Sequence, residues 1–97
     1  MIRSFADRGT ADIFDGVETR AARTTRPKSL WPTARRKLDQ LNRARDLADL
    51  AVPPGNQLER LRGNRIGQYS IRINKQYRVC FRWEYGYADE VEITDYH

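Results

Sequence analysis

The residues of this 97-residue chain that could do chemistry are a group of arginines and the final tripeptide, Asp95-Tyr96-His97. The arginines are Arg72, Arg78 and Arg82. Guanidinium groups bind phosphate oxygens through paired hydrogen bonds. RNA can be cleaved through its 2′-hydroxyl without a metal if a base removes that proton, cations stabilise the transition state and an acid protonates the leaving 5′-oxygen. The residue types present can fill these three roles.

The assignment of the proton-transfer roles starts from the only histidine of the chain, His97. Histidine is the usual acid or base near neutral pH. The second role would fall to Asp95, Tyr96 or a nearby carboxylate such as Glu59, or be left to the substrate complex. Two plainer interpretations stay open. A terminal histidine can lie in a frayed end, and arginine stems can cover a sheet while their charges extend into water.

The elements that must position these residues are predicted strands. Apolar residues alternate with polar ones over 69–73 and 77–83, as in half-buried strands. Residues 74–76 read as the loop of a hairpin. The favoured register pairs Ile71 with Val79 and sets Arg72 opposite Arg78. Because like charges facing each other across strands are destabilising, this face suggests an anionic partner.

The charge of the chain is unevenly distributed around a formal net value of +5 at pH 7. Residues 20–45 hold nine lysines or arginines and one acid, and residues 60–82 hold seven and no acid. The segment from residue 84 onward holds five acids and no lysine or arginine. Two basic blocks favour contact with nucleic acid or phosphate, although solvated helix faces would also explain either block.

Several functional classes lack their sequence signals. Cys80 is the only cysteine, so no disulfide framework or zinc spacing exists, and we expect it to be a small strand residue rather than a nucleophile. There is no glycine-rich phosphate loop, no histidine pair for a metal and no Ser/His/Asp set. We expect no metal site and no cofactor. No signal core or membrane-length apolar stretch is found, so we expect a cytoplasmic protein.

The N-terminal half predicts a short edge strand over 1–5 and a helix over 7–16, followed by a mostly irregular connection over 19–28 that could hold a turn of helix. A longer helix is expected to begin after a Ser29 cap, with Pro32 in its first turn. The apolar stripe of this helix continues to Ala48, and the Val52-Pro53-Pro54-Gly55 sequence is expected to end the helix.

The C-terminal half predicts an extended approach over 58–63, the hairpin, a loop around Gly86 and a last strand over 90–97 with Val91 and Ile93 inward. These elements predict a single α+β domain, 1–97, with two to three helices on an antiparallel sheet formed mainly by the C-terminal meander. The helices would cover the apolar face of the sheet. The opposite face, which bears Arg72, Arg78, Arg82 and Tyr96 and is called the arginine face here, would be open.

Six segments together resemble one known family, and the resemblance covers nearly the whole chain. They are 1–5, 34–41, 53–63, 67–74, 77–83 and the ending Thr94-Asp95-Tyr96-His97. The chain resembles the HigB (plasmid maintenance killer) toxins of the RelE superfamily. The resemblance implies a ribosome-dependent endoribonuclease, an mRNA interferase, that cleaves mRNA in the ribosomal A site. It also implies a helix-turn-helix antitoxin of the HigA type, with operator DNA bound only through the toxin–antitoxin complex.

The resemblance also implies roles for individual residues. The catalytic tail of the family falls on Asp95, Tyr96 and His97, and its strand arginine falls on Arg78. A basic position before a glycine falls on Arg62, and Glu59 stands where some members have histidine. We add Arg72 and Arg82 as phosphate contacts. The alternative is a non-catalytic module of the same fold that binds RNA or a partner.

The basic helix residues complete the expected contacts with RNA. They are Arg35, Arg36 and Arg43. Their attraction to ribosomal RNA would be independent of sequence and sensitive to salt. Simple solvation of the helix is the alternative.

Overall fold

A four-stranded antiparallel sheet and three α-helices form the described part of this computed structural model, which is residues 1–95. The helices are α1 (Arg8–Asp15), α2 (Arg20–Thr25) and α3 (Trp31–Arg43). The strands are β1 (Glu59–Arg60), β2 (Gln68–Arg72), β3 (Tyr77–Glu84) and β4 (Tyr87–Asp95). Short 3-10 turns are η1 (Lys28–Leu30), η2 (Leu47–Ala51), η3 (Pro54–Asn56) and η4 (Gly63–Arg65). The predicted α+β class is confirmed.

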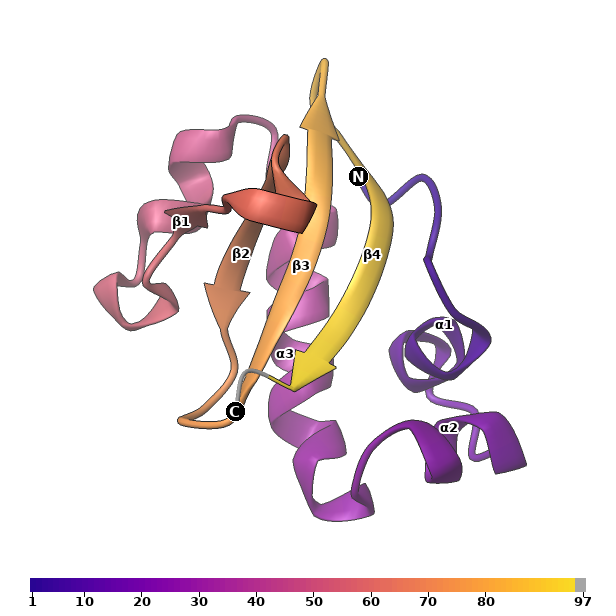
Figure 1. Ribbon diagram of the computed structural model, residues 1–97. Coiled ribbons are helices and arrows are strands. Elements are labelled where there is room, and N and C mark those ends of the chain that lie inside the picture. Colours follow the sequence, from indigo (N-terminus) through magenta and orange to yellow (C-terminus); the bar gives the residue numbers. More distant parts are fainter. Residues whose placement is uncertain (96–97) are drawn as a thin grey trace.

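The strands lie in the order β1-β2-β3-β4 (Figure 1). The predicted hairpin register is confirmed: Ile71 pairs with Val79, and Arg72 pairs with Arg78. The turn between β3 and β4 consists only of Tyr85 and Gly86, both with positive φ, so it is tighter than the expected loop. The pairing of β3 with β4 shifts by one residue between Cys80 and Arg82. This bulge falls near Glu90, whose φ is 52°.

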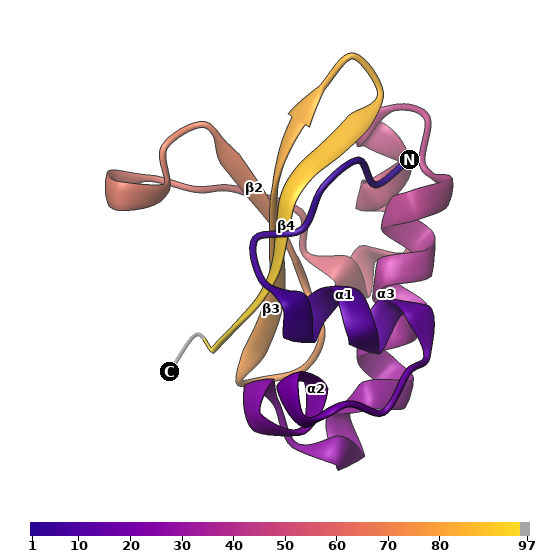
Figure 2. The ribbon, with the colours of Figure 1, turned by 90° about the vertical axis from the view of Figure 1, so that its right-hand side faces the viewer.

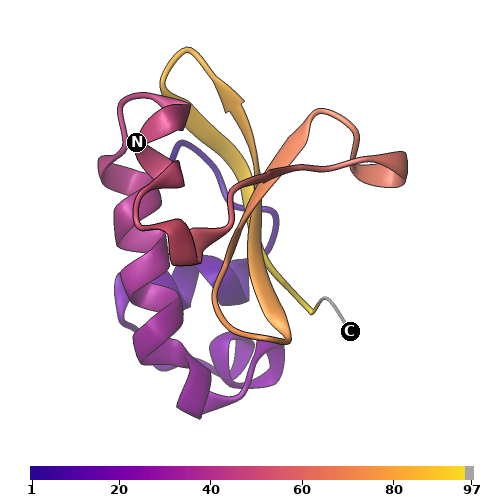
Figure 3. The ribbon, with the colours of Figure 1, turned by 90° about the vertical axis from the view of Figure 1, so that its left-hand side faces the viewer.

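The helices cover one face of the sheet (Figures 2 and 3). The buried contacts between these layers come from alternate strand residues and from the apolar stripe of α3. They include Ile71, Val79, Phe81, Val91 and Ile93 from the sheet, Leu38 and Leu41 from α3 and Ile13 from α1. Val91 and Ile93 point inward as predicted. No helix within residues 1–95 is long and apolar enough to cross a membrane.

The N-terminal segment follows the free edge of β4, but it is not the strand predicted over 1–5. It makes two isolated parallel bridges, Ile2 with Ala88 and Phe5 with Val91. The first bridge is made by the Met1 carbonyl and the Arg3 amide, while the Ile2 amide points away from β4 and donates to Asn42 Oδ1 of α3 at 2.9 Å. Between the two bridges Glu90 has a φ of 52°, and its amide donates to the Ser4 hydroxyl at 2.9 Å rather than to a backbone carbonyl, so the ladder is interrupted there.

The predicted helix over 7–16 is confirmed and is capped at both ends. Asp7 accepts a hydrogen bond from the Thr10 amide at 2.6 Å, and Gly16 closes the helix in the left-handed conformation with a φ of 75°. These are standard N-terminal and C-terminal caps.

The region 19–28, predicted to be mostly a connection, contains helix α2. The Thr19 hydroxyl caps it by accepting from the Ala22 amide at 3.1 Å. The predicted Ser29 cap of α3 is wrong, because α3 follows η1 directly with no side-chain cap. Pro32 does lie in the first turn, as expected.

The long helix also ends earlier than its apolar stripe predicted. Ala44 is extended, with a ψ of 136°, and η2 follows. The Asp49 carboxylate accepts from the amides of Arg45 and Asp46 at 3.0 and 3.1 Å. These bonds hold the pKa of Asp49 below its usual range. Local hydrogen bonds from a side chain thus compete successfully with continuation of the helix.

The arginine face of the sheet is more covered than predicted. Ser70 and Cys80 are fully buried there, and Arg78 is 7% exposed. Arg65 of η4 pairs with Glu92 of β4 at 3.1 Å, so this side chain crosses β3, and the coil of η4 lies in front of the sheet (Figure 1). The prediction of an open face is wrong at the centre of the sheet.

Candidate functional site

Arg78 is held by hydrogen bonds on the face of the sheet opposite the helices. Its Nε donates to Ser70 Oγ at 2.7 Å, and its Nη2 donates to the backbone carbonyl of Gln57. The Gln57 carbonyl is brought there by the segment that follows η3, where Gln57 itself has a φ of 45°. A buried cation with fixed partners is positioned before any ligand arrives, which favours recognition of an anion.

A polar pocket of about 340 Å³ adjoins Arg78. Its lining residues are Gln57, Arg72, Asn74, Lys75 and Arg78. Three of these are cations and none is a carboxylate. The Asn74 side chain accepts from the amides of Gln76 and Tyr77, both at 2.8 Å, and so fixes the hairpin turn that carries Lys75. The pocket has the charge and the donors required to bind a phosphodiester.

The last described residues of β4 lie next to this pocket. Thr94 pairs with Arg78, and Asp95 pairs with Tyr77. Gln76 Nε2 donates to Asp95 Oδ2 at 3.1 Å. The structure thus brings Asp95 to the hairpin that carries the cations, but its pairing with Tyr77, a core residue, places it on the helix-covered face of the sheet rather than on the face of Arg78. Tyr96 and His97, both predicted to be catalytic, lie outside the described residues.

Glu59 lies on the same face of the sheet as Arg78. It pairs with Ser70, whose hydroxyl holds the Arg78 guanidinium. Directly opposite residues in a sheet point to the same face. Glu59 is exposed, so its carboxylate is open to solvent on the side of the candidate site.

The remaining predicted phosphate contacts of the sheet region differ in their surroundings. Arg62 is exposed, follows β1 and makes no ion pair with the described residues. Arg82 lies toward the other end of β3 and is paired with Glu90 at 2.5 Å. The structure therefore does not bring Arg82 together with Arg78 and Arg72.

The three helix arginines are also separate from the pocket. Arg35, Arg36 and Arg43 are exposed on α3, in the layer on the other face of the sheet (Figure 2). A single flat surface cannot include both these residues and the Arg78 pocket.

Sequence reasoning missed the groups that hold Arg78 and one pocket cation. Lys75 had a usable signal, because it lies in the loop between the two arginine-bearing strands. Ser70 follows from the register, which sets it opposite Cys80. The Gln57 carbonyl had no signal in the sequence, since it comes from a separate segment.

Two other chemistries find no support in the described residues. Burial raises the pKa of the Cys80 thiol, so it stays protonated near neutral pH. No group of three histidine, cysteine or acidic side chains within residues 1–95 could hold a metal ion.

Comparison with known proteins connects this geometry to one family. Residues 3–97 match the family described as "RelE-like toxin of type II toxin-antitoxin system HigB". The chain is 48% identical over 62 residues to Toxin HigB-1 of Vibrio cholerae, a segment covering 64% of this chain and 65% of that protein. It is 41% identical over 58 residues to an uncharacterized protein of Haemophilus influenzae, covering 60% and 57% of the two chains. The chain belongs to the HigB-like family of RelE-like toxins of type II toxin–antitoxin systems.

Proposed function

We propose that this chain is a ribosome-dependent mRNA endoribonuclease that arrests translation and that it cleaves RNA beside the Arg78 pocket. The observation that carries the proposal is the fixed Arg78 guanidinium, with Arg72 and Lys75 beside it in a pocket whose described lining residues include three cations. Cations held in place before the reaction stabilise the charge that develops on the phosphate without reorganising. Family membership supports the toxin role.

In this mechanism the chain supplies every group and needs no metal or cofactor. Arg78 and Arg72 bind the scissile phosphate, and Arg62 binds the flanking backbone. His97 is one proton-transfer group. Asp95, Tyr96 or Glu59 supplies the other. Each group of this kind typically contributes about 10²–10⁴-fold to a rate.

Family membership supports an antitoxin as a partner of this chain. A helix-turn-helix antitoxin of the HigA type would neutralise the toxin, and operator DNA would be bound only through that complex. The ribosomal A site would present the mRNA, in the cytoplasm. Arg36 and Arg43 would add a salt-sensitive attraction to ribosomal RNA. Arg82 would contribute only after separating from Glu90, and Arg35 lines a different pocket.

One observation favours the alternative, a non-catalytic module that binds RNA. A carboxylate, Glu59, stands at the position where the resemblance expects some relatives to have histidine. If His97 were the only acid or base in place, the pocket could bind RNA without cleaving it.

Growth arrest on induced expression tests the proposed role. We expect Arg78→Ala and deletion of His97 each to abolish the arrest while circular dichroism shows an unchanged fold. Arg20→Ala is the matched control, because Arg20 is an exposed cation of α2 in the helical layer. Full toxicity of both site variants would overturn the site assignment.

A further inference from the structure

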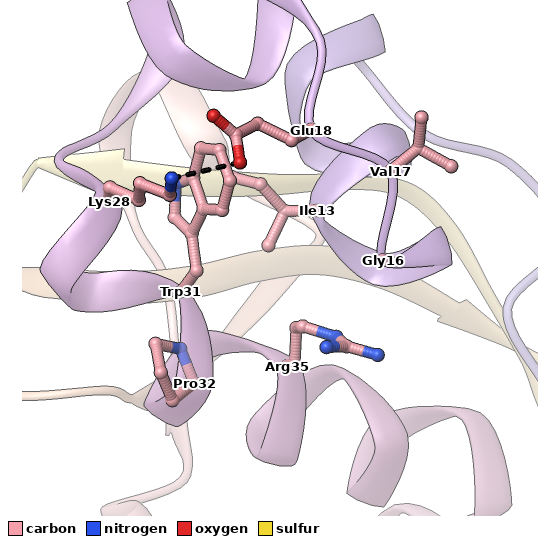
Figure 4. Close-up of a pocket in the computed structure, with 8 residues that line it drawn as sticks. All are labelled: Ile13, Gly16, Val17, Glu18, Lys28, Trp31, Pro32 and Arg35. Atoms are coloured by element: carbon pink, nitrogen blue, oxygen red, sulfur yellow. Dashed lines mark ion pairs between the residues drawn. The ribbon is translucent and has the colours of Figure 1, made fainter.

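A second pocket, of about 300 Å³, lies among the helices on the other face of the sheet from Arg78 (Figure 4). Ile13, Val17, Trp31 and Pro32 provide its apolar lining. The C-terminal end of α1 and the first turn of α3 bring these residues together. The pocket is therefore separate from the proposed catalytic site in position and in chemistry.

The floor of this pocket presents carbon atoms rather than polar groups. Trp31 is half-buried, and its indole Nε1 already donates to the Arg26 carbonyl at 3.3 Å. The ring can therefore contact an apolar ligand without leaving a buried donor unsatisfied. Val17, which lines the same pocket on its Gly16 side, is 50% exposed. Such surfaces favour an apolar side chain from a partner.

Of the charged residues at the rim of the pocket, Glu18 and Lys28 form an ion pair with each other, whereas Arg35 forms none with the described residues. Glu18 is bonded to Lys28 at 2.8 Å and to Arg23 at 3.4 Å. Figure 4 shows the Glu18–Lys28 pair at one end of the pocket and Arg35 reaching toward Gly16 at the other. A Cβ added at Gly16 would lie 2.9 Å from Arg35 Nη2, so the guanidinium rests against this glycine. Arg35 has no ion-pair partner in residues 1–95.

We propose that this pocket is the docking site for a segment of the antitoxin that inserts one apolar side chain against Trp31 and places a carboxylate on Arg35. The inference rests on the proposed function, because the toxin role supplies the partner. Tryptophan and arginine are the residue types that most often dominate protein interfaces. Here they lie four residues apart on α3, and such residues are neighbours on one helix face.

Charge complementarity favours an acidic protein segment over RNA. Among residues 1–95, Glu18 is the only acid in the lining and is already paired with Lys28 and Arg23, so the positive charge of Arg35 is left to attract a ligand. RNA would gain phosphate contacts from a single arginine here and would leave the apolar floor unused. The Arg78 pocket, with three cations, is the better site for phosphates.

The test measures, by titration calorimetry, the dissociation constant of the complex between this chain and the helix-turn-helix antitoxin proposed above, each purified separately. We expect Arg35→Glu to weaken binding about 30-fold or more, as for an interface hot spot. The matched control is Arg36→Glu, also exposed on α3 but outside the pocket, which should change binding less than about 3-fold. Val17→Asp should weaken binding. Val52→Asp is the control, because Val52 is an apolar residue outside this pocket that is even more exposed, at 72%, and its substitution should leave binding unchanged.

The outcomes separate this inference from the proposed function. Equal affinities of Arg35→Glu and Arg36→Glu, with folds confirmed by circular dichroism, would overturn the docking site. The absence of any complex with the wild-type chain would also overturn it. So would a self-association of the wild-type chain, seen by light scattering, that Arg35→Glu abolishes, since a second copy would then fill the pocket. Growth arrest by the wild-type chain alone tests the toxin role independently.

Discussion

Arg78 Nε donates a hydrogen bond to Ser70 Oγ at 2.7 Å across the β2–β3 pair. Ser70 is not the direct partner of Arg78 in the register, since Arg72 occupies that place. The bond therefore runs diagonally and directs the guanidinium along the sheet toward the Gln57 carbonyl. Two arginines opposite each other would repel. The diagonal bond explains how the sheet accommodates them and why one is buried.

Ser70→Ala removes the acceptor from a buried guanidinium. We expect a loss of about 1–3 kcal/mol in the free energy of unfolding, because a buried donor is left unsatisfied. We also expect slower RNA cleavage, since Arg78 is no longer fixed. Denaturant unfolding and a cleavage assay measure the two effects. Ser29→Ala, at an exposed serine before α3, should change neither. A Ser70→Ala variant with normal stability and rate would contradict the positioning role.

Lys75→Ala tests whether the pocket binds phosphates. The probe is a 2′-O-methyl RNA oligonucleotide, which cannot react through the 2′-oxygen. We expect weaker binding and a salt dependence smaller by about 0.7 in the slope of log K against log salt, as for one lost phosphate contact on a single strand. Fluorescence anisotropy at several salt concentrations measures it. Arg20→Ala changes the net charge equally and should leave the slope unchanged; equal effects of both variants would argue against a local site.

The register of the β2–β3 hairpin could be predicted from the sequence, because the alternation of apolar and polar residues fixes which side chains lie on each face of the sheet. Moving Ile71 from Val79 by one residue would place charged side chains in the core. The end of α3 could not be predicted in this way. The apolar spacing continues past Ala44, and the break depends on the Asp49 carboxylate binding two amides.

The candidate site was only partly predictable for a similar reason. Arg72 and Arg78 follow from the register of neighbouring strands. The burial of Arg78 depends on the Gln57 carbonyl, 21 residues away in the chain. Arg82 has the right parity for the arginine face, but the bulge near Glu90 supplies it with a carboxylate. Contacts between separate segments decide which arginines remain available for a ligand.

Asn56→Ala tests the connection between α3 and the segment that carries Gln57. Asn56 is fully buried and accepts from Lys37 Nζ at 2.6 Å. Its Nδ2 donates to Gln40 Oε1 and to the Leu50 carbonyl, both at 3.1 Å. We expect a loss of about 1–3 kcal/mol in unfolding free energy from the groups left without partners. Urea unfolding measures it, and Asn64→Ala, at an exposed asparagine, is the control. Equal urea midpoints of unfolding for Asn56→Ala and Asn64→Ala would contradict the stabilising role of the Asn56 hydrogen bonds.

Asp89→Asn tests a pH-dependent contact between the N-terminal segment and β4. Arg3 Nε donates to Asp89 Oδ1 at 2.9 Å, and this bond holds the pKa of Asp89 below its usual range. The folded pKa is lower than the unfolded one, so the contribution to stability is complete above the unfolded pKa and is lost as the pH falls through the folded pKa.

We therefore expect Asp89→Asn to show a smaller fall in Tm than the wild type between about pH 5 and pH 2. Asp39→Asn, at an exposed residue of α3, should retain the wild-type fall. Thermal melts followed by circular dichroism give both curves. Identical curves for Asp89→Asn and the wild type would show that the Arg3 contact does not matter for folding.

The most direct test of the central claim is to map cleavage of a translated message by primer extension, with and without ribosomes. The account predicts cuts by the wild-type chain only when ribosomes are present, and no cuts by Arg78→Ala at equal dose. Wild-type cuts that persist unchanged in Arg78→Ala, or RNA binding without cuts at any dose, would contradict it.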